Sequence, residues 1–147
     1  MNERAKTILH FWFNESSMDE KFSYNEVFDQ KIKGKFFLDY QKAINNEYDE
    51  WQNHAKECLA LIIMLDQFSR NLFRNNSKAF AMDAKARLIV NGAIDRSYIA
   101  ELSTEEILFI ILPLKSLKVL FDIFKNLLSC VAIINVMPNS LQTCRES

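Results

Sequence analysis

A polar stretch that could do chemistry follows directly after the most apolar run of the chain. The residues from Cys58 to Leu65 are almost all apolar, and "LDQFSRNLFR", residues 65–74, then brings one carboxylate, two amides and two guanidinium groups between bulky apolar side chains. The planar fork of arginine binds carboxylates and phosphates through two parallel hydrogen bonds, so this combination can hold a buried acid or an anionic ligand. With the nearest acid of the next predicted helix added, the candidate polar cluster consists of Asp66, Gln67, Arg70, Asn71, Arg74 and Asp83.

The spacing of this cluster predicts that most of it shares one side of a helix. If the helix runs on through residue 74, Asp66, Arg70 and Arg74 lie one turn apart on one row, and the two amides lie on the adjacent row. Two arginines against one acid leave a positive charge seeking a partner, for which Asp83 is the nearest candidate. Three interpretations are open: an ion network in which Asp66 and Asp83 share both arginines, a concave site where the surplus guanidinium receives a carboxylate or phosphate, and a solvated face. The bulky apolar neighbours count against the last.

No residue is assigned to catalysis or metal binding from the sequence. His10 lies beside "FWF", where a packed helix edge is expected, and His54 follows Trp51 near a helix start. The three cysteines are not at metal-ligand spacing, and Cys58 lies in an apolar stretch typical of a buried thiol. The chain contains no HExxH, GxSxG, P-loop, CxxC or GxGxxG motif. We therefore expect no metal and no cofactor, and favour a protein that is not an enzyme.

The elements that would position the cluster are all predicted to be helical. Apolar residues recur with helical period in Ala5–Phe13, in steps of four from Tyr24 to Tyr40, from Trp51 through the apolar run, and again in residues 79–89. The third of these segments is apolar nearly all round, so it is expected to be central. Only 2 Gly and 2 Pro occur in 147 residues, which favours long helices over a turn-rich β-sandwich. The predicted fold class is all-α.

Capping signals predict where several helices begin and end. Ser77 is expected to cap the fourth helix, and Asn91-Gly92 is expected to end it. Two S-x-x-E capping boxes are expected to open the second helix and a late one. These boxes are Ser23 with Glu26 and Ser103 with Glu106.

The second predicted helix carries a glycine and several lysines. Gly34 in a helix costs roughly 1 kcal/mol relative to alanine, so a close packing contact or a bend is expected there. The lysines off the apolar row are mixed with Asp29, Asp39 and Glu26, which indicates a solvated face and not a nucleic-acid stripe.

The overall charge and the N-terminus restrict the partners and the location. Eighteen basic against nineteen acidic residues give a net charge of −1, so we expect neither a nucleic-acid nor a membrane partner. The N-terminal apolar run is too short for a signal peptide and is preceded by Glu3. The cytoplasm is the expected location.

The segment after Pro113 differs in character from the rest. "LKSLKVLFDIFKNLLSCVAIINVM" is apolar but interrupted by charges, and its uncharged remainder, Asn126–Met137, is far shorter than the ~20 residues of a spanning helix. We expect an amphipathic helix and then a tail from Pro138. The predicted division is a helical domain over 1–114 and a divergent C-terminal helix and tail over 115–147.

Several stretches in a fixed order carry a family resemblance. They are "ILHFWF", "FDQKIKGKF", Trp51 ahead of an apolar helix, "LALIIMLDQFSRNLFRNNSKAFAMDAKA" and "FIILPL". From about residue 7 to residue 114 the chain resembles the bacterial and plant proteins grouped as the domain of unknown function 924 family. This resemblance implies an all-α, tetratricopeptide-like right-handed array of antiparallel helix pairs, and it brings no established reaction, substrate or cofactor.

Position by position, the resemblance covers the whole polar cluster and the late proline, Pro113. Ser69 stands where the family usually has proline, and we expect the helix to run on more smoothly there. After Leu114 the family's His-Ser-Glu motif is absent, which fits a truncated or frame-shifted copy. If the missing histidine and glutamate complete the family's polar site, this copy has lost the family's activity.

Three functions follow as expectations. The first is a non-enzymatic helical scaffold that binds a protein or peptide, because stacked helix pairs create concave surfaces. The second is an enzyme or small-anion binder that uses Asp66, Arg70, Arg74 and Asp83. The third is a degraded copy with no function of its own.

Overall fold

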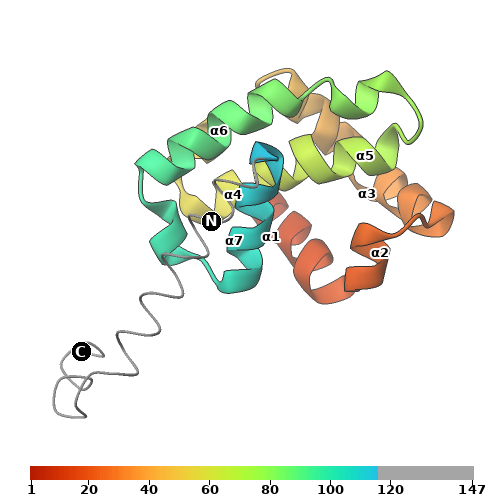
Figure 1. Ribbon diagram of the computed structural model, residues 1–147, viewed down its shortest axis with the longest axis horizontal. Helices are drawn as coiled ribbons and strands as arrows, with labels where there is room; N and C mark the ends of the chain where they lie inside the picture. Colours follow the sequence, from red (N-terminus) through yellow and green to blue (C-terminus); the bar gives the residue numbers. More distant parts are fainter. Residues whose placement is uncertain (116–147) are drawn as a thin grey trace, which may run out of the picture. The chain divides into compact units, whose positions relative to one another are not determined.

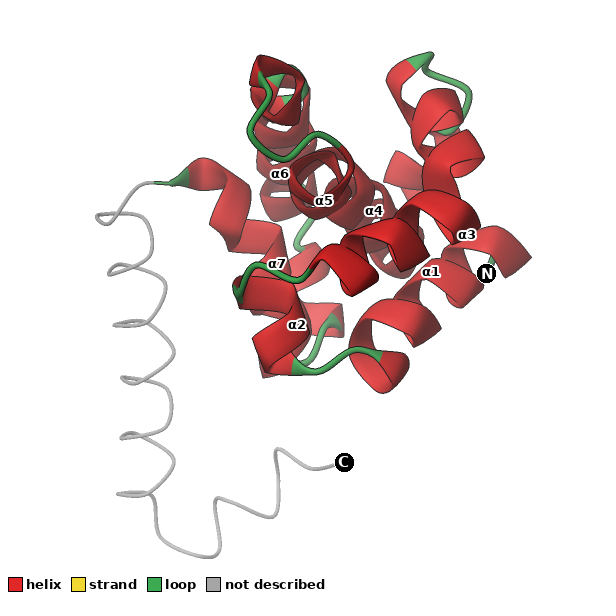
Figure 2. Cartoon of the chain, turned by 90° about the vertical axis from the view of Figure 1, so that its right-hand side faces the viewer, coloured by secondary structure: helices red, strands yellow, loops and turns green. Residues whose placement is uncertain are grey.

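The computed structural model of the protein describes residues 1–115, and every regular element in that range is helical (Figure 1). No strand occurs in these residues, which confirms the predicted all-α class (Figure 2). The finer expectation, a tetratricopeptide-like right-handed array of antiparallel pairs, stays a prediction. The helices are α1 (Glu3–His10), α2 (Met18–Phe22), α3 (Glu26–Ile44), α4 (Ala55–Ile63), α5 (Ser69–Leu72), α6 (Asp83–Asp95) and α7 (Thr104–Ile111).

Helix α4 is the centre of the compact unit formed by Met1–Pro113. Every side chain from Cys58 to Leu65 is fully buried, as the all-round apolar pattern predicts. Helices α1, α6 and α7 pack against α4 (Figure 1). A helix that is hydrophobic all round must be covered on all sides, and these neighbours cover it.

Aromatic rings join the N-terminal helices to this core. The ring of Phe36 on α3 lies 5.1 Å from Phe11 and 5.3 Å from Phe68, measured between centroids. Trp12 meets Phe109 of α7 edge to face at 5.5 Å. Such offset and edge-on pairs are the favoured aromatic geometries and add to the burial of apolar area.

Two helices widen into π-helical turns, and one of these turns carries the start of the polar cluster. Helix α1 continues as a π turn over Phe11–Glu15, and α4 continues through a π turn over Met64–Phe68 into α5. The helix therefore runs from Ala55 to Leu72, but not smoothly: the widened turn ends directly before Ser69. The helix does continue through Ser69, and the expectation that it is smoother there than with the family's usual proline stays a prediction.

Some helix starts differ from the capping predictions. The side chain of Asn25, not Ser23, accepts the capping hydrogen bond at the start of α3, and Ser23 instead donates to Asp19. The row of apolar residues on α3 is buried from Phe28 onward, but Tyr24 precedes the helix and is 68% exposed. The short helix α2 was not predicted.

Of the predicted boundaries of the later helices, one is confirmed and others are wrong. The capping box of Ser103 and Glu106 opens α7 as predicted. Asn76 and not Ser77 caps the 3₁₀ turn Ser77–Phe80, which precedes α6. Helix α6 runs past Gly92 to Asp95, so the predicted stop at Asn91-Gly92 is wrong.

Among residues 1–115, no helix is long and apolar enough to cross a membrane. The expected amphipathic helix and tail lie, apart from Lys115, outside the described residues.

Candidate functional site

The polar cluster is distributed over the π turn, α5 and the start of α6. Asp66 and Gln67 lie in the π turn, and the next polar pair lies on α5. Arg74 follows the end of α5, and Asp83 is the first residue of α6. The 3₁₀ turn Ser77–Phe80 lies between them and contacts α5.

Arg70 fastens α5 to the start of α6. Its Nη1 atom donates to Oδ1 of Asp83 at 2.8 Å and to the carbonyl oxygen of Ala79 at 2.7 Å. Its Nη2 atom lies 3.4 Å from Oδ1 of Asp66, an acid that is only 4% exposed. Gln67 donates through Nε2 to the other oxygen of Asp66 at 2.8 Å. Arg70 is therefore shared by the two acids that the sequence analysis proposed for it.

Arg74 pairs with an acid that the sequence analysis did not include. Asp29, on α3, accepts from Nε of Arg74 at 2.7 Å and from Nη2 at 2.9 Å. The amide of Asn71 donates to the same carboxylate at 2.9 Å. Hydrogen bonding to Asp29 raises the pKa of Arg74 above its ordinary value. The expectation that Asp66 and Asp83 share Arg74 is replaced by this pair.

Asp29 also changes the charge balance of the site. It is only 9% exposed, although the lysines among which it stands in the sequence were interpreted as a solvated face. With it, three carboxylates, Asp29, Asp66 and Asp83, accompany two guanidinium groups. The surplus positive charge expected from the sequence is therefore absent from this part of the structure. Two groups of ion pairs and hydrogen bonds with largely buried acids, one around Arg70 and one around Asp29, tie α3, α5 and α6 together.

Each arginine also lies over an exposed aromatic ring. The guanidinium carbon of Arg70 is 4.8 Å from the ring centroid of Phe80, and that of Arg74 is 5.0 Å from Tyr24. Phe80 is 58% exposed and Tyr24 is 68% exposed. Arginine stacks favourably on aromatic faces, and each cation here is held by an acid and by a ring.

A pocket of about 580 Å³ opens beside the two arginines. Asn75 at its edge has a left-handed backbone, with φ of 62°, a conformation that asparagine tolerates better than most residues. No carboxylate of the described residues lines the pocket. Its lining consists of Arg70, Arg74, Asn75, Asn76, Ser77, Ala79 and Phe80.

The other candidate groups do not form a reactive centre in this part of the chain. His10 is exposed, not packed, and pairs with Glu15 at 3.0 Å, whereas His54 precedes α4 as its sequence position predicts. Burial raises the pKa of the Cys58 thiol to about 11, so it stays protonated and unreactive near neutral pH. Within residues 1–115, no group of three or more His, Cys, Asp or Glu side chains is placed to hold a metal ion.

Comparison with known proteins gives one family and one solved relative. A family model described as bacterial protein of unknown function (DUF924) matches residues 8–126, so the match extends past Leu114. The solved structure of a protein of unknown function, ATU0120, from Agrobacterium tumefaciens is similar to this chain, with 32% sequence identity and a TM-score of 0.72. The similarity covers 76% of this chain but only 62% of the relative. No curated protein matches the chain.

Proposed function

This chain belongs to the DUF924 family of bacterial proteins of unknown function, and on that premise we propose that it is a non-catalytic helical protein that binds a peptide segment of a partner in the pocket beside Arg70 and Arg74. The cytoplasm stays its expected location.

The observation that carries this proposal is that both arginines are already neutralised. Arg70 and Arg74 pair with carboxylates that are themselves mostly buried, so together they present hydrogen-bond donors and not net charge. Peptide carbonyl oxygens accept such donors without bringing a charge of their own. The pairing also holds each guanidinium in place before a ligand arrives, which lowers the ordering cost of binding.

The apolar side of the pocket supports the same occupant. Phe80 lines it and is 58% exposed. Exposed rings that flank polar donors are typical anchors for a partner's apolar side chain. Asn75 and Asn76 add amide groups beside this ring. A peptide offers both an apolar side chain and backbone acceptors.

Selection from a displayed library of random peptides against the chain tests this proposal. We expect enriched peptides whose affinity falls at least tenfold in Phe80→Ala, because the anchor ring is lost. Leu88→Ala is the matched control, since Leu88 is also an exposed apolar residue, 73% exposed, and lies outside the pocket lining. Peptides that bind Phe80→Ala as well as the wild type contradict the proposal.

A second candidate function is the binding of a small carboxylate or phosphate in the same pocket. It is favoured by one observation, the presence of two arginines in a lining without a described carboxylate. A thermal-shift screen of phosphates and carboxylates tests it, and the stabilisation must disappear in Arg74→Ala. A chain that binds neither peptides nor anions in this pocket contradicts both candidates and favours the degraded copy.

A further inference from the structure

Gly34 occupies the middle of α3, and no described residue packs closely against it. The helix runs from Glu26 to Ile44, and a glycine within a helix lowers its stability relative to alanine. Its φ is not positive, and a methyl group built at its Cα would meet no atom within 4 Å. The close packing contact expected from the sequence is therefore absent from the described residues. What glycine offers at such a place is an uncovered helix backbone that another molecule can approach closely.

A groove of about 770 Å³ lies over this glycine. Leu38, one turn after Gly34, is 72% exposed, and Phe37 beside it is half-buried. Gly34, Leu38 and Gln41 follow one another at helical spacing on one side of α3, and all three line the groove. The groove thus has a bare backbone and an exposed apolar side chain along one helix face.

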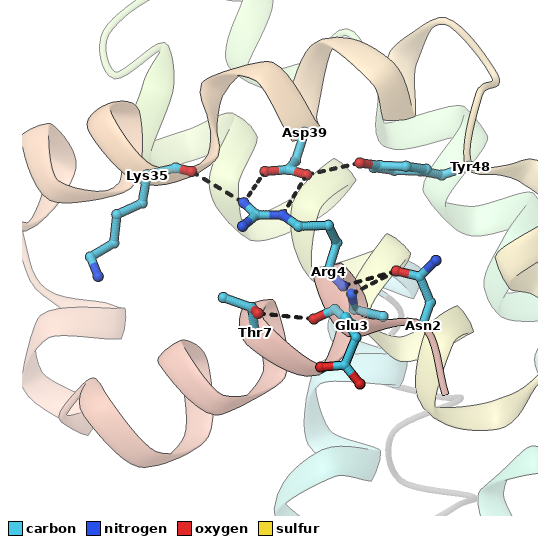
Figure 3. A network of polar contacts seen from close by, with 8 residues as sticks. Asn2, Glu3, Arg4, Thr7, Lys35, Asp39 and Tyr48 are labelled. Atoms are coloured by element: carbon cyan, nitrogen blue, oxygen red, sulfur yellow. Dashed lines mark hydrogen bonds and ion pairs between the residues drawn. The ribbon is translucent and has the colours of Figure 1, made fainter.

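Arg4 and Tyr48 both contact the carboxylate of Asp39 (Figure 3), and all three residues line the same groove. The Nε atom of Arg4 donates to Oδ1 of Asp39 at 3.1 Å, and its Nη2 atom also pairs with this carboxylate. The hydroxyl of Tyr48 donates to the same acid at 2.8 Å. The acid is 6% exposed, so it has little charge to offer a partner.

The remaining charges of the groove are mostly positive. Three lysines line it, and no described residue forms an ion pair with any of them. Glu47 is the only other acid in the described lining. In a chain whose net charge is −1, this face therefore concentrates uncompensated positive charge. The lysines are Lys33, Lys35 and Lys42.

We infer that this groove docks an acidic segment of a partner protein, with an apolar side chain against Leu38 and the backbone close to Gly34. Charge complementarity with the three lysines selects an acidic partner. The apolar floor and the bare helix backbone favour a polypeptide over a nucleic acid, which would need contacts along a broader basic surface. The segment 116–147 of this chain does not fit, because it carries three basic and two acidic side chains.

This inference does not rest on the proposed function, because the groove shares no lining residue with the pocket beside Arg70 and Arg74. The test is a selection from a displayed library of random 15-residue peptides (a length of about 22 Å as a helix), after depletion on the Gly34→Leu variant. Nothing lies within 4 Å of the added side chain's Cβ, so this variant is expected to fold, which a thermal melt checks. The enriched peptides should be acidic.

The affinity of the enriched peptides decides the inference. Their binding should weaken at least tenfold in Gly34→Leu and in the charge reversal Lys35→Glu, and it should weaken as salt rises. Gly92→Ala, a change at the other glycine of the chain, and Phe80→Ala should leave it unchanged. Failure to enrich any peptide, enrichment of neutral or basic peptides, or equal binding to Gly34→Leu overturns the inference. So does a labelled oligonucleotide or a second copy of the chain that binds in the same Gly34-dependent way.

Discussion

Arg74 and Asp29 are 45 positions apart in the sequence and meet through two parallel hydrogen bonds, Nε to Oδ2 at 2.7 Å and Nη2 to Oδ1 at 2.9 Å. This two-point geometry is the strongest form of an arginine–carboxylate contact. It connects the end of α5 to α3, and these two helices are far apart in the sequence. The contact makes the candidate site part of the tertiary structure and not a local feature of one helix.

The Asp29→Ala variant should unfold more easily than the wild type. Breaking a buried ion pair costs 3–5 kcal/mol, and because the Arg74 side chain is 29% exposed, we expect a loss of about 2 kcal/mol in the free energy of unfolding. Denaturant titration measures it. A double-mutant cycle with Arg74→Ala supplies the control, and a coupling energy near zero would contradict the importance of the pair.

The Asp66→Ala variant should lose about 3 kcal/mol of stability, because Arg70 loses an ion-pair partner and Gln67 loses an acceptor, and this acid is only 4% exposed. Asp95→Ala is the matched control: this acid is exposed at the end of α6, and its removal should change the free energy of unfolding by less than about 0.5 kcal/mol. If both variants melt at the same temperature, the network adds no stability.

The sequence predicted one half of the site and missed the other for a physical reason. Asp66 and Arg70 are one turn apart, and Asp83 opens the next helix, so local spacing was enough to bring them together. Asp29 belongs to another helix and stands among lysines. An acid in such a run has the same sequence pattern whether it is exposed to solvent or buried in an ion pair. Only the packing of α3 against α5 decides that Asp29 is buried.

The Ser69→Ala variant should show how much stability is lost when the buried hydroxyl of Tyr40 has no hydrogen-bond partner. Ser69 donates its one hydroxyl proton to the carbonyl oxygen of Leu65 at 2.6 Å, so in the contact of 3.0 Å between Tyr40 Oη and Ser69 Oγ the phenol is the donor. Removing it should lower the free energy of unfolding by about 1–2 kcal/mol, because Tyr40 is only 3% exposed. Adding Tyr40→Phe should recover part of this loss. A double variant that is less stable than Ser69→Ala alone would contradict this account.

The stability of the protein should depend on Tyr48 in alkaline solution. Burial, followed by the hydrogen bond to Asp39, raises the pKa of Tyr48 from 10.0 to about 12. The unfolded state then loses the phenolic proton first, so the stability that Tyr48 contributes is fully present below pH 10.0 and is lost as the pH rises towards about 12. Denaturant titrations of wild type and Tyr48→Phe across this window measure the difference, which should shrink with rising pH. If the difference in the free energy of unfolding between the two proteins stays constant with pH, the stability does not depend on the ionisation of Tyr48.

The Gly34→Ala variant should be more stable than the wild type by about 0.5–1 kcal/mol, because alanine favours the helix and the added methyl meets nothing. Gly92→Ala is the comparison, since its Cβ would lie 3.1 Å from Nη1 of Arg96 and the gain should be smaller. Thermal melts of the two variants show which of them gains more stability. A destabilised Gly34→Ala would mean that the glycine has a role inside the fold.

The helical class was predictable, but several helix boundaries were not. Helical period and the scarcity of glycine and proline were enough to predict the class and the burial of α4. Asn91-Gly92 reads as a stop signal, yet Val90 and Ala93 on either side are fully buried, so the packing of α6 against the core extends the helix through it. Ser23 and Asn25 are both good caps, and local sequence cannot rank two caps that lie two residues apart.

The π turn over Met64–Phe68 has a consequence for how related chains can differ in length. A π turn closes its hydrogen bond one residue later than an α turn, so it contains about one residue more than a regular helix needs, and each residue rotates the helix by about 100°. Loss of one residue inside this turn can leave the helix regular, with Cys58 still facing the core and Arg70 still facing α6. Loss of one residue elsewhere between Cys58 and Arg70 would rotate one part of the helix relative to the other, so that Cys58 would no longer face the core or Arg70 would no longer face α6. Deletions tolerated by this helix should therefore fall in the five residues of the turn.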